Sequence, residues 1–188
     1  STRKGNVVLL EDFMKEAVKK AIEEIKKRKK GSVKNAEAIG YGAIKYTLLR
    51  VSPEKNVIFD WDSAMNFEGE SSPYIQYAHA RASSILKRSK INKNIKADFL
   101  NSIEELELIK KLREFPDMVS NATSSLRPNT ICSYLHELSK TFTNFYHACP
   151  VLKADKKTRE ARLSLVLATK IVLKKGLNLL GIEAPENM

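Results

Sequence analysis

The chain has 188 residues, enough for one medium-sized domain or for one domain with part of another. Hydrophobic residues make up 43%, which excludes wholesale disorder because that fraction can bury a core. Lys and Arg number 33 against 22 Asp and Glu, giving a formal net charge of +11. Such a surplus favours a polyanionic partner, most often nucleic acid, and the alternative is a lysine-rich solvated surface.

The cysteines and the apolar runs exclude further classes. Cys132 and Cys149 lack the C-x-x-C spacing of zinc and redox sites, so we expect both to be reduced core residues of a cytosolic protein. No apolar run approaches the roughly 18 residues of a membrane span, so we expect no membrane partner. The chain opens Ser1-Thr2-Arg3 without an initiator methionine or a signal-peptide pattern, and we therefore expect a part of something longer.

Helical periodicity dominates the first 50 residues. Apolar residues recur every three or four positions over residues 11–30, and lysines occupy the remaining faces. Gly31 ends this helix, and Ser32 suits the N-cap of a second helix that runs to about Arg50. Gly40 and Gly42 are costly inside that second helix, and either close backbone packing or a local break would explain them.

A loop region follows the second helix. Pro53 marks a loop, and residues 57–59 are the only plausible strand, too short to build a sheet. A polar loop over residues 67–72 then precedes a helix that Pro73 can start at its first turn.

The rest of the chain predicts a series of helices. They cover residues 73–90, 102–114, 116–125, 128–149 and 157–175. The helix after Pro128 has the clearest amphipathic stripe: Ile131, Leu135, Leu138, Phe142, Phe145 and Cys149. Apolar residues of the last helix cover more than one face, which predicts a central position. We therefore expect an all-α fold, an antiparallel helical bundle.

No complete active site can be found in the sequence. Glycine-rich nucleotide motifs, a P-loop and metal-spaced His or Cys clusters are all absent, so we expect no metal site. His79, His136 and His147 are isolated, and we interpret them as surface or boundary residues.

One helix face combines aromatic and basic side chains. Tyr74, Tyr77, Arg81 and Arg88 lie at i, i+3, i+7 and i+14, beside the apolar stripe of the same helix. Tyrosine can stack on an unpaired base, and arginine offers forked donors to a base or phosphate. From spacing alone, the tyrosines can equally complete the edge of the core, with Arg81 paired to a carboxylate.

Two further features have two interpretations each. Tyr146 flanks the stripe of its helix, and spacing does not decide whether it is buried. The basic run at residues 26–30 is either a solvated helix end or a patch that contacts phosphates.

Several blocks along the chain resemble arginyl-tRNA synthetases, in the order of that family. The run Phe59-Asp60-Trp61-Asp62, then Phe67-Glu68-Gly69 and residues 73–81, resembles the entry to the family's anticodon-binding domain. Ala161-Arg162-Leu163-Ser164-Leu165 is similar to the motif that names the helical DALR domain. Residues 145–152, and residues 176–182 with Pro185, Glu186 and Met188, are similar to the family's remaining C-terminal blocks.

The first residues resemble the end of the mobile signature loop of class I synthetases. In that class a lysine of the loop stabilises the ATP phosphates while the adenylate forms, as a cation can beside developing negative charge. Thr2 stands at the position of the second lysine of the pattern, which leaves Arg3 and Lys4 as the candidates for its role. The nucleotide-binding fold of the class would lie upstream of this chain.

The resemblance also implies roles for individual residues. In this family the domain reads the anticodon loop, chiefly its middle base, a cytosine in arginine tRNAs. Tyr74 and Arg81 match positions that contact this base, Tyr146 matches an aromatic position of the same pocket, and Met188 closes it. The residues so implied to bind the anticodon are Phe67, Glu68, Gly69, Tyr74, Tyr77, Arg81, Tyr146 and Met188.

The resemblance leads to the following expectations. Residues 1–66 are the helical C-terminal end of a catalytic core, with the signature loop at 1–6, and residues 67–188 are the DALR-type anticodon-binding domain. The whole enzyme is a cytoplasmic arginine–tRNA ligase that uses ATP and Mg²⁺, whereas this part binds arginine tRNA as a monomer, without DNA, metal or cofactor. The alternatives are a freestanding helical RNA-binding module and a protein-interaction domain.

Overall fold

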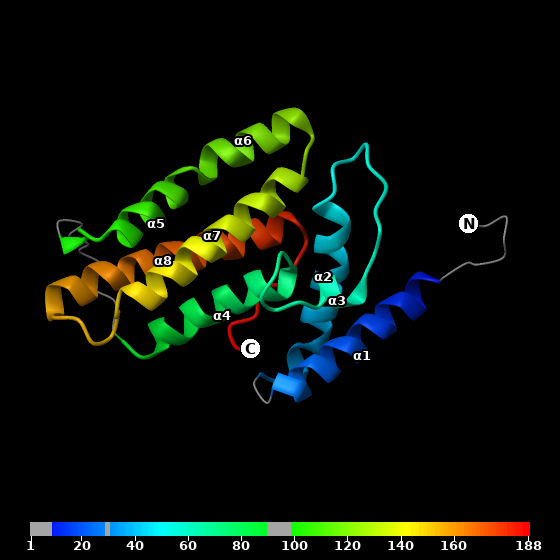
Figure 1. Cartoon of the computed structure of the whole chain (residues 1–188), viewed down its shortest axis with the longest axis horizontal. Coiled ribbons are helices and arrows are strands. Elements are labelled where there is room, and N and C mark those ends of the chain that lie inside the picture. Colours follow the sequence, from blue (N-terminus) through cyan, green and yellow to red (C-terminus); the bar gives the residue numbers. More distant parts are fainter. Residues whose placement is uncertain (1–8, 29–30, 90–98) are drawn as a thin grey trace.

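The chain folds into helices throughout its described part (Figure 1). The computed structural model describes residues 9–28, 31–89 and 99–188. In chain order the elements are α1 (Leu10–Arg28), the 3₁₀ helix η2 (Val33–Asn35), α2 (Ala36–Leu49), α3 (Trp61–Ala64), α4 (Ser72–Lys87), α5 (Ile103–Arg113), α6 (Phe115–Ser125), α7 (Asn129–Ala148) and α8 (Lys156–Leu179). This confirms the predicted all-α class. None of the helices in these ranges combines the length and the apolar character that crossing a bilayer requires.

Helices α4 to α8 form the larger body of the molecule. Figure 1 shows α8 running back along both α4 and α7, with α5 and α6 lying along the outer side of α7. The stripe predicted for α7 is buried along its whole length, from Ile131 to Cys149. Helix α8 packs against α4, α5 and α7 at once, which confirms its predicted central position. Both cysteines are free and buried.

A buried ion pair joins α5 to α8. Glu105 is 1% exposed and accepts the Nε–H of Arg162 at 2.6 Å. The same carboxylate closes a capping box with Ser102 at the start of α5, and Arg162 also donates to the carbonyl of Pro150. Burial raises the pKa of Glu105, but the backbone N–H groups and the Arg162 guanidinium outweigh it and hold that pKa below its ordinary value.

Helices α1 and α2 form a second, smaller body with its own apolar cluster. A Cβ at Gly40 would lie 2.8 Å from the carbonyl of Ala17 in α1, and one at Gly42 would lie 2.8 Å from the Ser72 hydroxyl in α4. Of the two explanations for these glycines, the structure therefore favours close packing. Tyr46 of α2 reaches into the larger body, where its hydroxyl donates to the carbonyl of Cys132.

The strand predicted at residues 57–59 was wrong. These residues have no regular structure, and no described segment pairs with them. Ile58 is 89% exposed, whereas the Phe59 ring lies 4.7 Å from that of Phe13 and 4.8 Å from that of Trp61, centroid to centroid. Without a partner strand, residues 57–59 form an irregular connection before the short helix α3, and only Phe59 packs against neighbouring rings.

The interpretation of His79 as a surface or boundary residue was also wrong, because the side chain is fully buried. Its Nδ1 lies 2.8 Å from the carbonyl of Pro185, so this nitrogen carries the proton. Three residues earlier on α4, the Gln76 amide donates to the carbonyls of Ala38 and Glu183. The segment at residues 181–188, called the tail below, thus covers a buried polar row of α4.

We expect substitution of Glu105 by Ala to lower the free energy of unfolding by about 3–5 kcal/mol, because it removes a buried carboxylate that both pairs with the half-buried Arg162 and caps α5. Urea denaturation measures the change. Glu137→Ala is the control, since Glu137 forms an exposed pair with Lys140 and its loss costs below about 0.5 kcal/mol. Equal effects of the two substitutions would contradict a structural role for the buried pair.

We expect His79 to make the fold less stable as the pH falls. Burial lowers the pKa of His79, so below about pH 6.5 the unfolded chain takes up a proton that the native chain does not. Stability is then full above this pH and decreases below it, by at most about 1.4 kcal/mol per pH unit.

The test compares urea denaturation of the wild type and His79→Asn from pH 7.5 to 5.0. Asparagine can donate to Pro185 without titrating, and therefore should lose less stability over this range. Burial also lowers the pKa of His136, which is present in both proteins and cancels in the comparison. Parallel pH profiles would show that His79 does not contribute.

Candidate nucleic-acid interface

A cavity of about 320 Å³ lies where the smaller body meets α4, α7 and the tail. It falls within the roughly 300–1,000 Å³ usual for small-molecule sites. Its lining comes from α1, the turn before η2, α2, α4, α7 and the loop before α4. Six of the predicted anticodon-binding residues line it or its rim: Phe67, Glu68, Tyr74, Tyr77, Arg81 and Met188.

Arg81 is held between two aromatic rings at one side of this cavity. Its guanidinium carbon lies 4.8 Å from the ring centroid of Tyr77 and 4.8 Å from that of Tyr146. Within the described ranges no carboxylate pairs with Arg81. The alternative in which Arg81 pairs with a carboxylate therefore does not hold for these residues. Stacking fixes the plane of the guanidinium and leaves its edge free to donate hydrogen bonds.

The cavity lining also pairs a second arginine with the loop before α4. Arg28, in the last turn of α1, lies over the Phe67 ring with its guanidinium carbon 4.4 Å from the centroid. Its Nη2 lies 3.6 Å from Oε1 of Glu68. The Asn66 side chain accepts the backbone N–H groups of Glu68 and Gly69 and so fixes the loop. Gly69 shapes this turn but does not line the cavity.

Met188 reaches the cavity because the tail crosses a glycine. Gly31 has a positive φ of 92°, and a Cβ there would lie 3.0 Å from the carbonyl carbon of Met188. Both the backbone conformation and the close approach therefore favour glycine at this position. Asn35 donates to the carbonyl of Asn187 and holds the tail in place.

A second, more polar groove of about 640 Å³ adjoins the cavity. It lies between α4, the end of α7, the α7–α8 turn and the tail. Tyr77, Arg81 and Met188 line both spaces, whereas Tyr146, 39% exposed, lines only the groove. The resemblance implied that Tyr146 lines the same pocket as Tyr74. In the structure Tyr146 lies in the groove instead, and it contacts Arg81, which lines both spaces.

Sequence reasoning missed part of this site. Gly31, Ser32, Ile39 and Thr143 also line the cavity, and no local pattern distinguishes them. Arg28 is part of the basic run at residues 26–30, for which two interpretations were open. In the structure its side chain lines the cavity. Residues 29 and 30 of that run, and Arg3 and Lys4 of the signature-loop resemblance, lie outside the described residues.

No group of three or more His, Cys, Asp or Glu side chains in residues 9–28, 31–89 and 99–188 is arranged to hold a metal ion. The cavity is lined mainly by aromatic and apolar side chains, together with Arg28, Arg81 and a few polar groups. Such a lining fits a flat ring with polar edges.

Comparison with known proteins agrees with this geometry. Residues 75–188 match the family model of the DALR anticodon binding domain, and residues 1–61 match that of the catalytic domain of class I (R) tRNA synthetases. The chain is 43% identical to arginine–tRNA ligase of Methanocella arvoryzae and 45% identical to that of Thermococcus sibiricus, and both alignments cover all of this chain. It spans about a third of the length of these relatives, 34% and 32%.

Solved structures give the same result. The arginyl-tRNA synthetase of Thermus thermophilus superposes with a TM-score of 0.90 at 32% identity, over 97% of this chain and 32% of that one. The Plasmodium falciparum arginyl-tRNA synthetase superposes with a TM-score of 0.83 at 29% identity, over 97% of this chain and 34% of that one. With the family model matched over residues 75–188, the chain belongs to the DALR anticodon binding domain family, and over its whole length it is similar to about a third of an arginine–tRNA ligase.

Proposed function

We propose that this chain binds the anticodon loop of arginine tRNA and that the cavity between Tyr74, Arg28 and Met188 receives an unpaired base. The observation that carries the proposal is the Arg81 guanidinium, fixed between Tyr77 and Tyr146 beside a cavity of about 320 Å³. This arrangement offers hydrogen-bond donors of fixed direction at the edge of a space with aromatic walls.

Stacking and edge recognition would supply different parts of the binding. Contact of a base with an aromatic ring is worth roughly 1–3 kcal/mol and tolerates any base. Discrimination then comes from the base edge, where a wrong base leaves the Arg81 donors unpaired. By resemblance to the family, the preferred base is the middle cytosine of the anticodon. Tyr74, Tyr77 and Tyr146 give the stacking surfaces, Met188 closes the cavity, and Phe67, Glu68 and Gly69 approach the loop.

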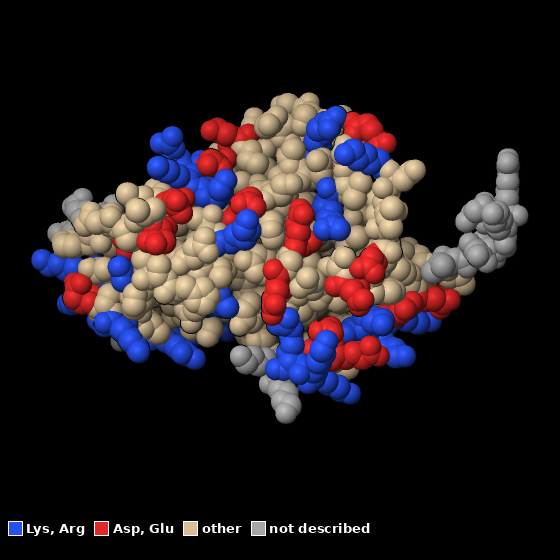
Figure 2. All heavy atoms as spheres, viewed as in Figure 1, with Lys and Arg blue, Asp and Glu red and all other residues tan. Residues whose placement is uncertain are grey.

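Surface charge supports an RNA ligand. Figure 2 shows Lys and Arg along the lower edge of the molecule, near the C-terminal ends of α1 and α4. Arg28, in the last turn of α1, and Arg81, near the middle of α4, both line the cavity. Positive charge around a binding site draws a polyanion to it and makes the affinity depend on salt.

The whole protein, of which this chain would be about a third, is proposed to be a cytoplasmic arginine–tRNA ligase that uses ATP and Mg²⁺. In this proposal residues 1–66 end the catalytic core, residues 67–188 bind the anticodon, and one chain binds one tRNA. Arg3 and Lys4 are the candidates for the signature-loop cation. No step of the aminoacylation reaction is assigned to the described residues.

We expect a change of the middle anticodon base to weaken binding of an arginine anticodon stem-loop by about 1–3 kcal/mol. Tyr146→Ala should cost a similar amount, because it removes one face of the Arg81 sandwich. The two changes should not be additive, because both act through Arg81. Fluorescence anisotropy at about 100 mM salt measures all four combinations.

Tyr41→Ala is the matched control, because this half-buried tyrosine lines neither the cavity nor the groove. It should bind both stem-loops as the wild type does. If all proteins bind the two stem-loops alike, only charge is at work, and the chain is a helical RNA-binding module without anticodon preference. Absence of binding even at low salt would indicate a protein-interaction domain.

We expect the 188-residue chain to bind tRNA but to form no aminoacyl-adenylate, because it spans only about a third of its relatives and the nucleotide-binding fold of the class would lie upstream. Arginine-dependent exchange between ATP and pyrophosphate measures adenylate formation directly. Exchange above the level of an arginine-free control would contradict the expectation that this chain forms no adenylate.

A further inference from the structure

The tail contributes little to the apolar core, although it covers α4. Of its residues, Ile182 and Pro185 are buried, and polar contacts such as the bond from Lys45 to the carbonyl of Gly181 hold the rest. Segments with few buried apolar contacts open at a lower cost in free energy than the core does. The tail, the red end of the chain in Figure 1, can therefore come away from α4 while the bundle stays folded.

His79 is a titratable side chain buried beneath this tail. Its Nδ1 donates to the carbonyl of Pro185, whereas its Nε2 is buried and has no hydrogen-bond partner among the described residues. A protonated imidazole carries a hydrogen on both nitrogens. With the tail closed, the second N–H and the charge would be buried without an acceptor, which is costly. The closed tail therefore accommodates the neutral form of His79.

The charges that face His79 also favour its neutral form. Lys170 and Lys174 approach it from α8, and Glu186 approaches it from the tail. Burial lowers the pKa of His79 most, the two lysines act in the same direction, and Glu186 opposes them. Glu186 is paired with Lys87 at 3.3 Å and with Lys170 at 2.8 Å, which holds its pKa near 2. Its charge is therefore constant over the pH range in which His79 titrates.

We propose that the tail is a proton-sensitive latch, which leaves α4 when His79 takes up a proton and so opens one wall of the cavity. Met188 of the tail lines the cavity, whereas His79 does not, so the proton acts on the cavity through the tail. The effect on RNA rests on the proposed function, but the opening of the tail does not. A base that contacts Met188 favours the closed tail and so makes protonation of His79 harder.

The direction of the pH dependence follows from the two states of the tail. With the tail open, His79 is solvated and titrates near its ordinary pKa of about 6.5. Below this pH the open state binds a proton that the closed state does not. The ratio of open to closed chains then rises by up to about tenfold for each pH unit. Above this pH the tail stays closed.

The first measurement follows the tail without RNA. Labelling the methionine methyl groups with ¹³C gives each of the four methionines a resonance, and Met188→Leu identifies that of Met188. Between pH 7.5 and 5.0 we expect this resonance to move towards the position of a solvent-exposed methionine. The resonance of Met65, which is buried in the smaller body, should keep its position and show that the fold persists.

Two variants test whether His79 is the group that titrates. His79→Asn should abolish the movement, because asparagine does not titrate. Lys174→Gln removes a positive charge that faces His79, so it should shift the midpoint of the movement to higher pH. Lys174 is exposed, so this variant keeps the fold even if the substitution of His79 does not.

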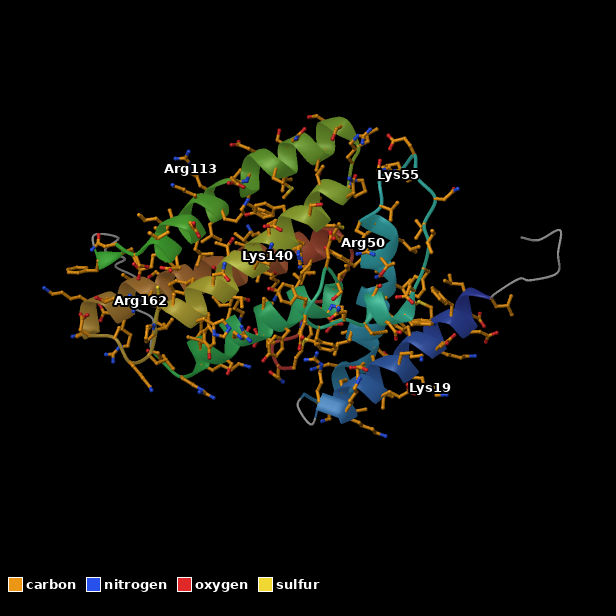
Figure 3. All side chains as sticks on the ribbon, in the orientation of Figure 1. Lys19, Arg50, Lys55, Arg113, Lys140 and Arg162 are labelled. Carbon is orange, nitrogen blue, oxygen red and sulfur yellow. The ribbon has the colours of Figure 1, made fainter. Side chains whose placement is uncertain are left out.

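Two lysine substitutions serve as matched controls for Lys174→Gln. Lys175 is exposed and follows Lys174 on α8, about 100° further round the helix. Lys140 lies on α7 (Figure 3), where its charge faces His136. Neither Lys175→Gln nor Lys140→Gln should move the midpoint.

The second measurement repeats the binding of the arginine anticodon stem-loop from pH 7.5 to 5.0. We expect the wild-type affinity to fall by up to about tenfold for each pH unit below the midpoint, and that of His79→Asn to fall less. His147 lines the groove and gains positive charge over the same range, but it is present in both proteins.

The outcomes separate the latch from the proposed function. If the Met188 resonance does not move in the wild type, or if Lys174→Gln leaves its midpoint unchanged, the latch inference is wrong. If the resonance moves as expected but neither pH nor the middle anticodon base affects binding, the latch is supported and the proposed function fails. If the base matters and the affinities of the wild type and His79→Asn depend on pH alike, the tail does not control the cavity.

Discussion

The buried amide of Gln76 ties together three stretches of chain that are far apart in sequence. From α4 it donates to the carbonyl of Ala38 in α2 at 2.9 Å and to that of Glu183 in the tail at 2.8 Å. A buried donor that loses its acceptor costs about 1–3 kcal/mol, so separation of any one stretch is penalised. His79 repeats the constraint one turn later at Pro185. The relative position of the smaller body, the bundle and the tail therefore depends on a polar row of α4, and the cavity lies where they meet.

Contacts within the chain position the side chains of this site without a ligand. Arg81 and Arg28 are each held over aromatic rings, and the loop at residues 67–69 is fixed by Asn66. Side chains that are already ordered lose little further entropy on binding, so more of the contact energy remains as affinity. The Glu105–Arg162 pair has a different role. Arg162 lies in the run that resembles the motif of the DALR domain, yet it lines neither the cavity nor the groove and instead joins α5 to α8.

The sequence predicts what is local and misses what depends on distant contacts. Period and capping were sufficient for the long helices and for the buried stripe of α7, because each turn carries its own signal, but they did not predict the short elements η2 and α3. They also placed Tyr74, Tyr77 and Arg81 on one face of α4. The burial of His79 could not be predicted from α4, since the tail that covers it comes about a hundred residues later. Likewise the position of Arg28 depends on its contact with Phe67, and the need for glycine at position 31 depends on Met188. The contact of Tyr146 with Arg81 requires the packing of α7 on α4. The resemblance identified the residues of the site, and their roles in RNA binding stay predictions.

The placement of Met188 beside Gly31 has a consequence for biosynthesis. A ribosome makes α1, α2 and the whole bundle before it adds the residues that cover α4, so the nascent chain carries an open cavity until translation has passed position 188. A chain cut before residue 181 can still bury its apolar stripes. It lacks one wall of the cavity, and it leaves Gln76 and His79 without the carbonyls of Glu183 and Pro185.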